Sequence, residues 1–160
     1  TMALKSDRIS NTSRVDFFMN EIAERGGVVV FSTSGSGASM DQAQQLCTYG
    51  ALASGKVPIG LLMGDMVNLD LTRQKLNPYK EEVQQGGKVT LWDKGEVVTN
   101  RLYPAIAVTA GNAAYLGPSG LITNLPIGSI ASPRIGTFMS QKDVDGYAKV
   151  SINLPSTFYP

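Results

Sequence analysis

Apolar residues in this chain gather in short runs that are separated by glycine, serine, asparagine and aspartate. Val28-Val29-Val30-Phe31 places four β-forming residues in a row, which is a strong strand signal. Residues 57–63 form a longer apolar run, and residues 66–71 alternate apolar and polar positions as a half-buried strand does. Further short strands are expected at 106–108, 114–116, 121–123, 134–140 and 147–152.

Turn residues divide these runs into a regular series. Residues 40–49 are ambiguous, because their glutamine-rich half suits a helix while 46–49 suits a strand. The clearest hairpin is expected over 88–92 and 96–100, with Asp93-Lys94-Gly95 as its turn. Many short strands with a turn about every ten residues predict an all-β fold, a barrel or sandwich of short antiparallel strands with little helix.

The two ends of the chain have a different pattern. Residues 1–25 are polar apart from Phe17-Phe18-Met19 and Ile22, so we divide the chain into an N-terminal arm (1–25), a β domain (26–154) and a C-terminal tail (155–160). Asp16 is a possible cap for a short helix over 17–24, and an extended arm is the alternative. The aromatic residues of the arm either anchor it to a partner or fold back on the chain's own core.

Composition restricts the functional classes. Only 17% of the 160 residues are charged, against about 25% in average proteins, and the formal net charge is +1. This favours either a surface covered by a partner or a surface rich in uncharged polar residues. No apolar run of 18 residues is present, so no transmembrane helix and no membrane partner is expected. Residues 1–7 lack the apolar stretch of a signal peptide, and synthesis in the cytoplasm is therefore expected.

Residue types that usually carry chemistry are scarce. The chain has no histidine, which removes the commonest general base and the commonest metal ligand. Cys47 is the single cysteine, so an intramolecular disulfide and a cysteine zinc cluster are excluded. A catalytic thiolate would need a basic partner, and Cys47 is better interpreted as a small buried apolar residue. We therefore expect no enzyme activity, no cofactor and no metal.

Four motifs resemble functional sites without completing them. The loop 34–37 (Ser-Gly-Ser-Gly) lacks the lysine of a phosphate-binding loop, and the calcium-like start at Asp143 lacks the later glycine and glutamate of an EF-hand. The close carboxylates lie in predicted turns beside lysines, and the basic patch is diluted by two glutamates, so no nucleic-acid partner is expected. The carboxylate pairs are Glu81/Glu82, Asp93/Glu96 and Asp143/Asp145, and the basic patch consists of Arg73, Lys75, Lys80 and Lys88.

Several stretches, taken together, resemble a known family. The longest are 67–77 (Val-Asn-Leu-Asp-Leu-Thr-Arg-Gln-Lys-Leu-Asn) and 81–91 (Glu-Glu-Val-Gln-Gln-Gly-Gly-Lys-Val-Thr-Leu). Others are 2–5, 17–21, 94–100, 114–116, 120–123, 136–140 and 145–150. In their order and spacing these stretches are similar to capsid cement (head decoration) proteins of tailed bacteriophages. Pro78 and the final Phe158-Tyr159-Pro160 have no place in that pattern.

The resemblance implies a β-rich structural protein on the outer surface of the virion. It implies binding to the major capsid protein, bridging of neighbouring subunits, and stabilisation of the shell against the pressure of packed DNA. It also implies a homo-oligomer, a trimer in preference to a dimer. Another virion component, such as a tail, fibre or connector protein, is the alternative. Because aromatic anchors often dominate interfaces, we expect contacts at Phe17, Phe18, Ile22, Phe158 and Tyr159.

Overall fold

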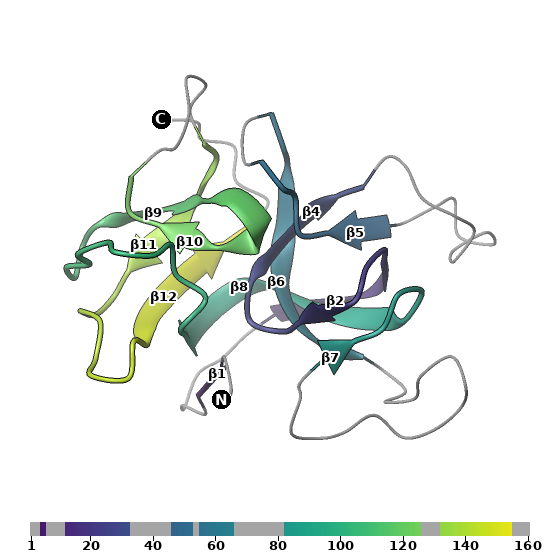
Figure 1. The fold of residues 1–160 in the computed structure, drawn as a ribbon, viewed down its shortest axis with the longest axis horizontal. Helices are drawn as coiled ribbons and strands as arrows, with labels where there is room; N and C mark the ends of the chain where they lie inside the picture. The colour runs from purple at the N-terminus through teal and green to yellow at the C-terminus, as the bar shows by residue number, and fades with distance from the viewer. Residues whose placement is uncertain are drawn as a thin grey trace.

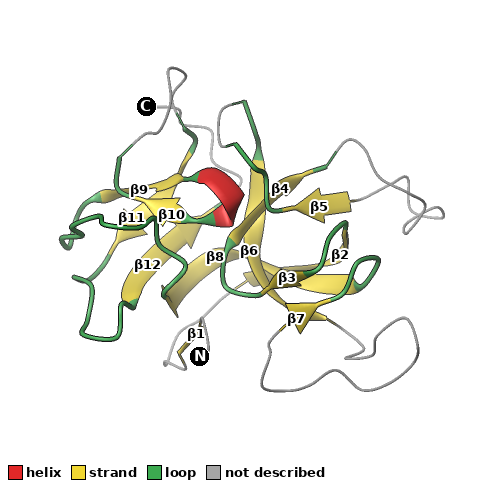
Figure 2. Ribbon diagram, in the orientation of Figure 1, coloured by secondary structure: helices red, strands yellow, loops and turns green. Residues whose placement is uncertain are grey.

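The computed structural model describes residues 4–5, 12–32, 46–52, 55–65, 82–125 and 132–154 (Figures 1 and 2). Strands dominate these residues, and the helical part is one short 3-10 turn, which confirms the all-β prediction. The elements are β1 (Leu4–Lys5), β2 (Thr12–Met19), β3 (Ala23–Glu24), β4 (Val28–Phe31), β5 (Leu46–Thr48), β6 (Pro58–Asp65), β7 (Glu82–Val83), β8 (Lys88–Thr99), β9 (Ala113–Leu116), η2 (Pro118–Gly120), β10 (Ile122–Thr123), β11 (Arg134–Phe138) and β12 (Ala148–Asn153).

Five strands close into a barrel. Their order is β8-β2-β5-β4-β6, and β6 pairs again with β8 to complete the ring. The pairing of β2 with β5 is parallel, and the other four pairings are antiparallel. Of the two architectures expected from the sequence, the barrel is therefore the one present.

A second sheet continues from the barrel through β8. It has the order β8-β12-β11-β9-β10, and we call it the side sheet (Figure 1, left of the barrel). The first half of β8 pairs with β2 and β6 inside the barrel, whereas residues 94–99 pair with β12. A single long strand therefore joins the two parts of the molecule.

The continuity of β8 shows that the predicted hairpin over 88–100 is wrong. Asp93-Lys94-Gly95 lies inside one continuous strand, and Gly95 has φ 131°, a value that favours glycine. Each half of β8 finds partners elsewhere, so the two halves do not pair with each other. The turn-forming triplet marks the point where the chain leaves the barrel for the side sheet.

Two hydrophobic cores follow from this arrangement. One lies in the barrel and includes Phe17, Val29, Leu62 and Leu91. The other joins the side sheet to the outer wall of the barrel. The alternation of β4 serves both, because Val29 belongs to the barrel core while its neighbours Val28 and Val30 belong to the second one. This explains why all three consecutive valines are fully buried.

The N-terminal segment is extended, not helical. Residues 12–24, which the sequence groups with the arm, form β2 and β3. Strand β2 is one of the five strands of the barrel, and β3 pairs with β7 in a small two-stranded sheet. Of the two alternatives for 17–24, the extended one is therefore present, and this part of the arm is paired with the β domain.

Other strand predictions have mixed outcomes. Strands are present within or overlapping 28–31, 46–49, 57–63, 114–116, 121–123, 134–140 and 147–152. Residues 106–108 are irregular, and Val108 is buried in the second core without pairing as a strand. The segments 66–71 and 155–160 lie outside the described residues. No helix in the ranges that the structure describes is long and apolar enough to cross a membrane.

Candidate functional site

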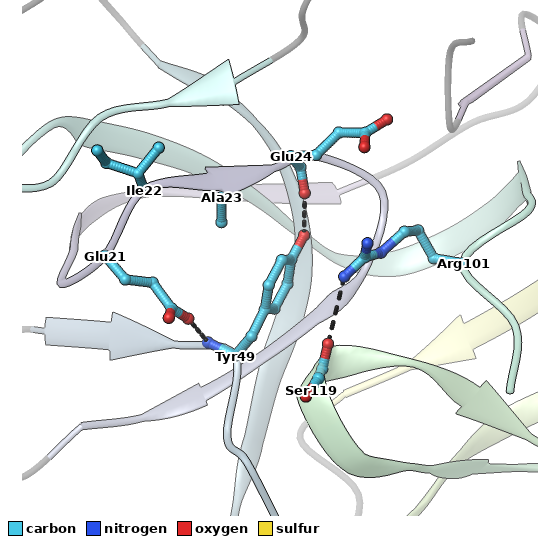
Figure 3. Close-up of a pocket in the computed structure, with 7 residues that line it drawn as sticks. All are labelled: Glu21, Ile22, Ala23, Glu24, Tyr49, Arg101 and Ser119. Carbon is cyan, nitrogen blue, oxygen red and sulfur yellow. Dashed lines mark hydrogen bonds between the residues drawn. The ribbon is translucent and has the colours of Figure 1, made fainter.

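A hollow of about 280 Å³ lies where the barrel meets the side sheet (Figure 3). The turn that leads into β3, and β3 itself, supply four of its lining residues. One more follows β5, one follows β8, and one comes from η2. The lining consists of Glu21, Ile22, Ala23, Glu24, Tyr49, Arg101 and Ser119.

Tyr49 stands at the centre of this hollow and is held from several sides. Its hydroxyl donates to the Glu24 carbonyl at 2.5 Å and accepts from the Gly27 N–H at 3.1 Å. Its own N–H donates to Glu21 Oε1 at 2.6 Å, and Thr48 Oγ1 donates to the same oxygen at 2.8 Å. Figure 3 shows the Glu21 carboxylate turned toward the Tyr49 backbone, so this carboxylate takes part in hydrogen bonds that hold the local structure.

Residues that precede and follow the strands of the side sheet contact the Tyr49 ring from the opposite direction. The Arg101 guanidinium lies 5.2 Å from the ring centroid, within the range of a cation–π contact, and its Nη2 donates to the Ser119 carbonyl at 3.3 Å. Gly120 has φ 74°, and a Cβ there would overlap the Tyr49 ring, so only glycine allows this close packing. The Ser119 N–H donates to the Gly50 carbonyl at 2.7 Å. These contacts fasten η2 to the barrel.

The Tyr49 hydroxyl, at the centre of the hollow, is a weak acid in this environment. Burial raises the pKa of Tyr49, and this outweighs the opposing effect of the Gly27 N–H and of Arg101. The phenol therefore stays protonated at neutral pH and acts as a hydrogen-bond group in the joint. The arrangement supports a structural role for Tyr49.

Cys47 is equally unreactive. It is fully buried in the barrel core, and its Sγ lies 3.8 Å from Met19 Sδ. Burial, with a smaller effect from Glu21, raises the pKa of the thiol from 9.0 to about 12. The structure thus agrees with the interpretation of Cys47 as a core residue. Among the described residues, no three histidine, cysteine or acidic side chains are grouped as metal ligands would be.

The residues expected at an interface lie in different environments. Phe17 is only 9% exposed and belongs to the barrel core, with its ring 5.8 Å from that of Phe31 in an edge-on arrangement. Phe18 is partly buried, and Ile22 at the rim of the hollow is 62% exposed. Phe158 and Tyr159 lie outside the described residues. An interface role for the five stays a prediction, and Ile22 has the exposure for it.

Sequence reasoning missed three exposed apolar residues in the segments at the end of β4 and before β6. Phe31, Leu52 and Val57 are 48%, 71% and 46% exposed, and we call them the apolar barrel end. The Phe31 N–H donates to the Val57 carbonyl at 3.2 Å, which places these two residues side by side, and the backbone carbonyl of Leu52 lies close to Gly50. A strand ending in an aromatic residue, followed by isolated apolar residues in a glycine-rich loop, was the available signal.

Two more exposed apolar residues, Met139 and Val144, stand in the connection between β11 and β12. Val144 is fully exposed, and the turn around it is rigid because the Asp143 carboxylate accepts the N–H groups of Asp145 at 3.0 Å and Tyr147 at 2.8 Å. The turn is closed by a bond from the Gly146 N–H to the Asp143 carbonyl at 3.1 Å. Turn chemistry therefore accounts for the calcium-like pattern at Asp143. We call residues 143–145 the acidic tip.

The remaining motif residues are dispersed. Glu96 pairs with Lys149 at 3.4 Å on the side sheet, whereas Asp93 is buried within β8, so these carboxylates do not share a cleft. Glu82 and Lys88 lie in β7 and β8. The loop 34–37, Glu81, Arg73, Lys75 and Lys80 lie outside the described residues.

Comparison with known proteins gives no assignment. No family model matches the chain, and no curated protein matches it. The argument for function therefore depends on the residues and contacts described above.

Proposed function

We propose that the chain is a structural virion protein, a capsid cement protein that binds the outer surface of a phage head and bridges major capsid protein subunits. The proposal starts from the order and spacing of the stretches that resemble this family. The all-β fold, with two cores joined by β8, is compatible with a stiff bridging module. The proposal also includes self-association, because an oligomer can hold several shell subunits at once.

The observation that carries the proposal is the distribution of exposed apolar side chains. They occur at the apolar barrel end, in the turn with Ile22, and in the connection between β11 and β12, which holds Met139 and Val144; Leu125, after β10, is a further single exposed residue. Single exposed apolar residues are ordinary, but adjacent ones usually mark a contact surface. A protein that joins neighbours needs more than one such surface, and this distribution meets that need.

The chemistry of the buried groups also favours binding over turnover. Tyr49 and Cys47 both have raised pKa values, so neither supplies an anionic nucleophile at neutral pH. The Glu21 carboxylate accepts two structural hydrogen bonds. The hollow therefore serves as a joint, and its rim presents Ile22 as a surface anchor for the shell.

Co-sedimentation tests the proposal. The purified chain is mixed with expanded, DNA-free shells of the phage that encodes it, and the bound fraction is measured by centrifugation. We expect saturable binding, and the variant Ile22→Asp is expected to bind at least tenfold more weakly. Leu125→Asp is the matched control, since Leu125 is 65% exposed against 62% for Ile22.

Three results would count differently. No binding by the unaltered chain contradicts the proposed function. Equal loss in both variants shows that Ile22 has no special role and removes it as the shell anchor. Saturable binding with loss only in Ile22→Asp supports both the function and the assigned surface.

A further inference from the structure

The turn that carries Ile22 lies where the chain passes from the barrel to the small two-stranded sheet. Strands β2 and β5 run in parallel, and their pairing reaches Met19 and Cys47. One further backbone bond follows, from the Asn20 N–H to the Cys47 carbonyl at 2.9 Å. The chain then turns away from β5 to form β3, which pairs with β7. Ile22 therefore stands between the two sheets.

The Glu21 side chain continues the link between the two segments beyond this backbone bond. Its Oε1 accepts from Thr48 Oγ1 at 2.8 Å and from the Tyr49 N–H at 2.6 Å. On the other side of Ile22, the Tyr49 hydroxyl donates to the Glu24 carbonyl at 2.5 Å. The turn is therefore fastened to residues 48–49 both before and after Ile22.

This fastening determines where the Ile22 side chain points. Figure 3 shows the Glu21 side chain directed toward the Tyr49 backbone, whereas the Ile22 side chain points away from Tyr49. Ile22 is 62% exposed as a result. An apolar side chain on a loose turn gains free energy by folding down onto nearby apolar surface. The two bonds of Glu21 oppose that movement and keep Ile22 directed outward.

We propose that Glu21 is a positioning residue for shell binding, which acts by holding the turn so that Ile22 is presented before a capsid subunit arrives. This inference rests on the proposed function and extends it to a residue whose bonds lie inside the chain. A turn that is already ordered loses less conformational entropy when it binds. Fixing the backbone of one residue costs a free energy that corresponds to roughly a tenfold change in affinity.

Two other roles for Glu21 make different predictions. If its negative charge contacts the shell directly, Glu21→Gln should weaken binding as much as Glu21→Ala does. If Glu21 only stabilises the fold, its loss should weaken binding equally whether or not Ile22 is present. Glu21→Gln keeps an oxygen that can accept both hydrogen bonds and removes the charge, so it separates geometry from charge.

The first test measures the turn without any shell. Amide hydrogen exchange over residues 22–24 is followed in the unaltered chain, Glu21→Ala, Glu21→Gln and Glu96→Ala. The last variant is the control, because it removes the same charge from an ion pair with Lys149 on the side sheet. We expect exchange about tenfold faster in Glu21→Ala and within about threefold of the unaltered chain in the other two variants.

The second test is a double-mutant cycle on shell binding. Affinity for expanded shells that contain the proposed major capsid partner is measured for the unaltered chain, Glu21→Ala, Ile22→Ala and the double variant. We expect Glu21→Ala to bind about tenfold more weakly in the unaltered chain and to change affinity by less than about twofold when Ile22 is already alanine. Glu21→Gln and Glu96→Ala should bind within about threefold of the unaltered chain.

A second substitution keeps the inference testable if Glu21→Ala does not fold. Thr48→Val removes one of the two donors to Glu21 and keeps the shape of the side chain. It should change exchange and affinity in the same direction as Glu21→Ala, by a smaller factor. The cycle with Ile22→Ala is then repeated with this variant.

The outcomes separate this inference from the proposed function. Unchanged exchange over 22–24 in Glu21→Ala overturns the positioning role, whatever the shells show. Shell binding that Glu21→Ala leaves intact, or weakens equally with and without Ile22, also overturns it and leaves a cement function standing. If the unaltered chain binds no shell, the proposed function is wrong and the positioning role falls with it, even where exchange shows that Glu21 holds the turn.

Discussion

Removing the hydroxyl of Tyr49 measures how much its hydrogen bonds stabilise the contact between the barrel and the side sheet. The substitution Tyr49→Phe keeps the ring, so the contacts with Arg101 and Gly120 remain. It deletes the donor to the Glu24 carbonyl and the acceptor of the Gly27 N–H. Both backbone groups would then lack these partners within a partly buried site.

The expected loss follows from these two bonds. A buried group left without its partner costs about 1–3 kcal/mol, and partial solvent access places each of these toward the lower end. Tyr49→Phe should therefore lower the free energy of unfolding by about 2–4 kcal/mol. Because the ring is preserved, the surface exposed on unfolding should not change, and neither should the urea m-value.

Urea denaturation followed by the fluorescence of the single tryptophan, Trp92, measures this loss. All samples share one protein concentration, since self-association adds to apparent stability. The control is Tyr115→Phe, because Tyr115 on β9 is also partly buried and has no hydrogen bond from its hydroxyl within the described residues. The control should change stability by less than about 0.5 kcal/mol. Equal stability of the two variants would refute the joint at Tyr49.

Two further predictions concern the sheets and the thiol. Gly136→Ala places a Cβ against the Ser151 carbonyl and should lower the free energy of unfolding, measured by urea denaturation, by about 2–3 kcal/mol. The control is Gly64→Ala, where a Cβ meets nothing within 4 Å. Equal losses of stability in the two variants would contradict the close approach of β11 and β12. Cys47, with a pKa of about 12 when folded against 9.0 when unfolded, should resist a disulfide reagent at pH 8. Between those two pKa values the thiol ionises only in the unfolded chain, so the contribution of Cys47 to the free energy of unfolding should fall as pH rises from 9 toward 12. Rapid labelling of the native chain at pH 8 would contradict the burial of this thiol.

Local pattern was enough to predict the strands of the cores. The valine run of β4 and the alternation of Ala148, Val150 and Ile152 in β12 are visible in the sequence, and both are buried as expected. Such patterns report burial of one face, which is a local property. They therefore predict the fold class and many strand positions.

The errors arose where long-range pairing overrides local preference. Asp93-Lys94-Gly95 has the composition of a turn, yet β12 pairs with residues 94–99 and keeps the strand continuous. Similarly, residues 106–108 have the composition of a strand, yet they are irregular, and Val108 is buried in the second core without pairing as a strand. Pairing partners far along the chain decide both cases, and no local signal encodes them.

The candidate surfaces were harder to predict than the fold. Tyr49, Arg101 and Ser119 come from three distant segments, so only the folded chain brings them together. Val144 was recognised as part of a turn, but its full exposure depends on how the turn projects from the side sheet. Exposure of an apolar residue is a property of the tertiary structure and is not visible in composition.

The central claim is that the chain acts by joining neighbouring subunits through buried surface, without turning over a substrate. The proposed function places the chain on a phage head, so electron microscopy of intact virions that contain the proposed major capsid partner, at side-chain resolution, tests this most directly. We expect many copies on the outer face of the shell, each touching more than one capsid subunit, with Ile22 at a contact. Particles whose shells carry no copy of the chain, or only a few copies at one vertex, would contradict the account.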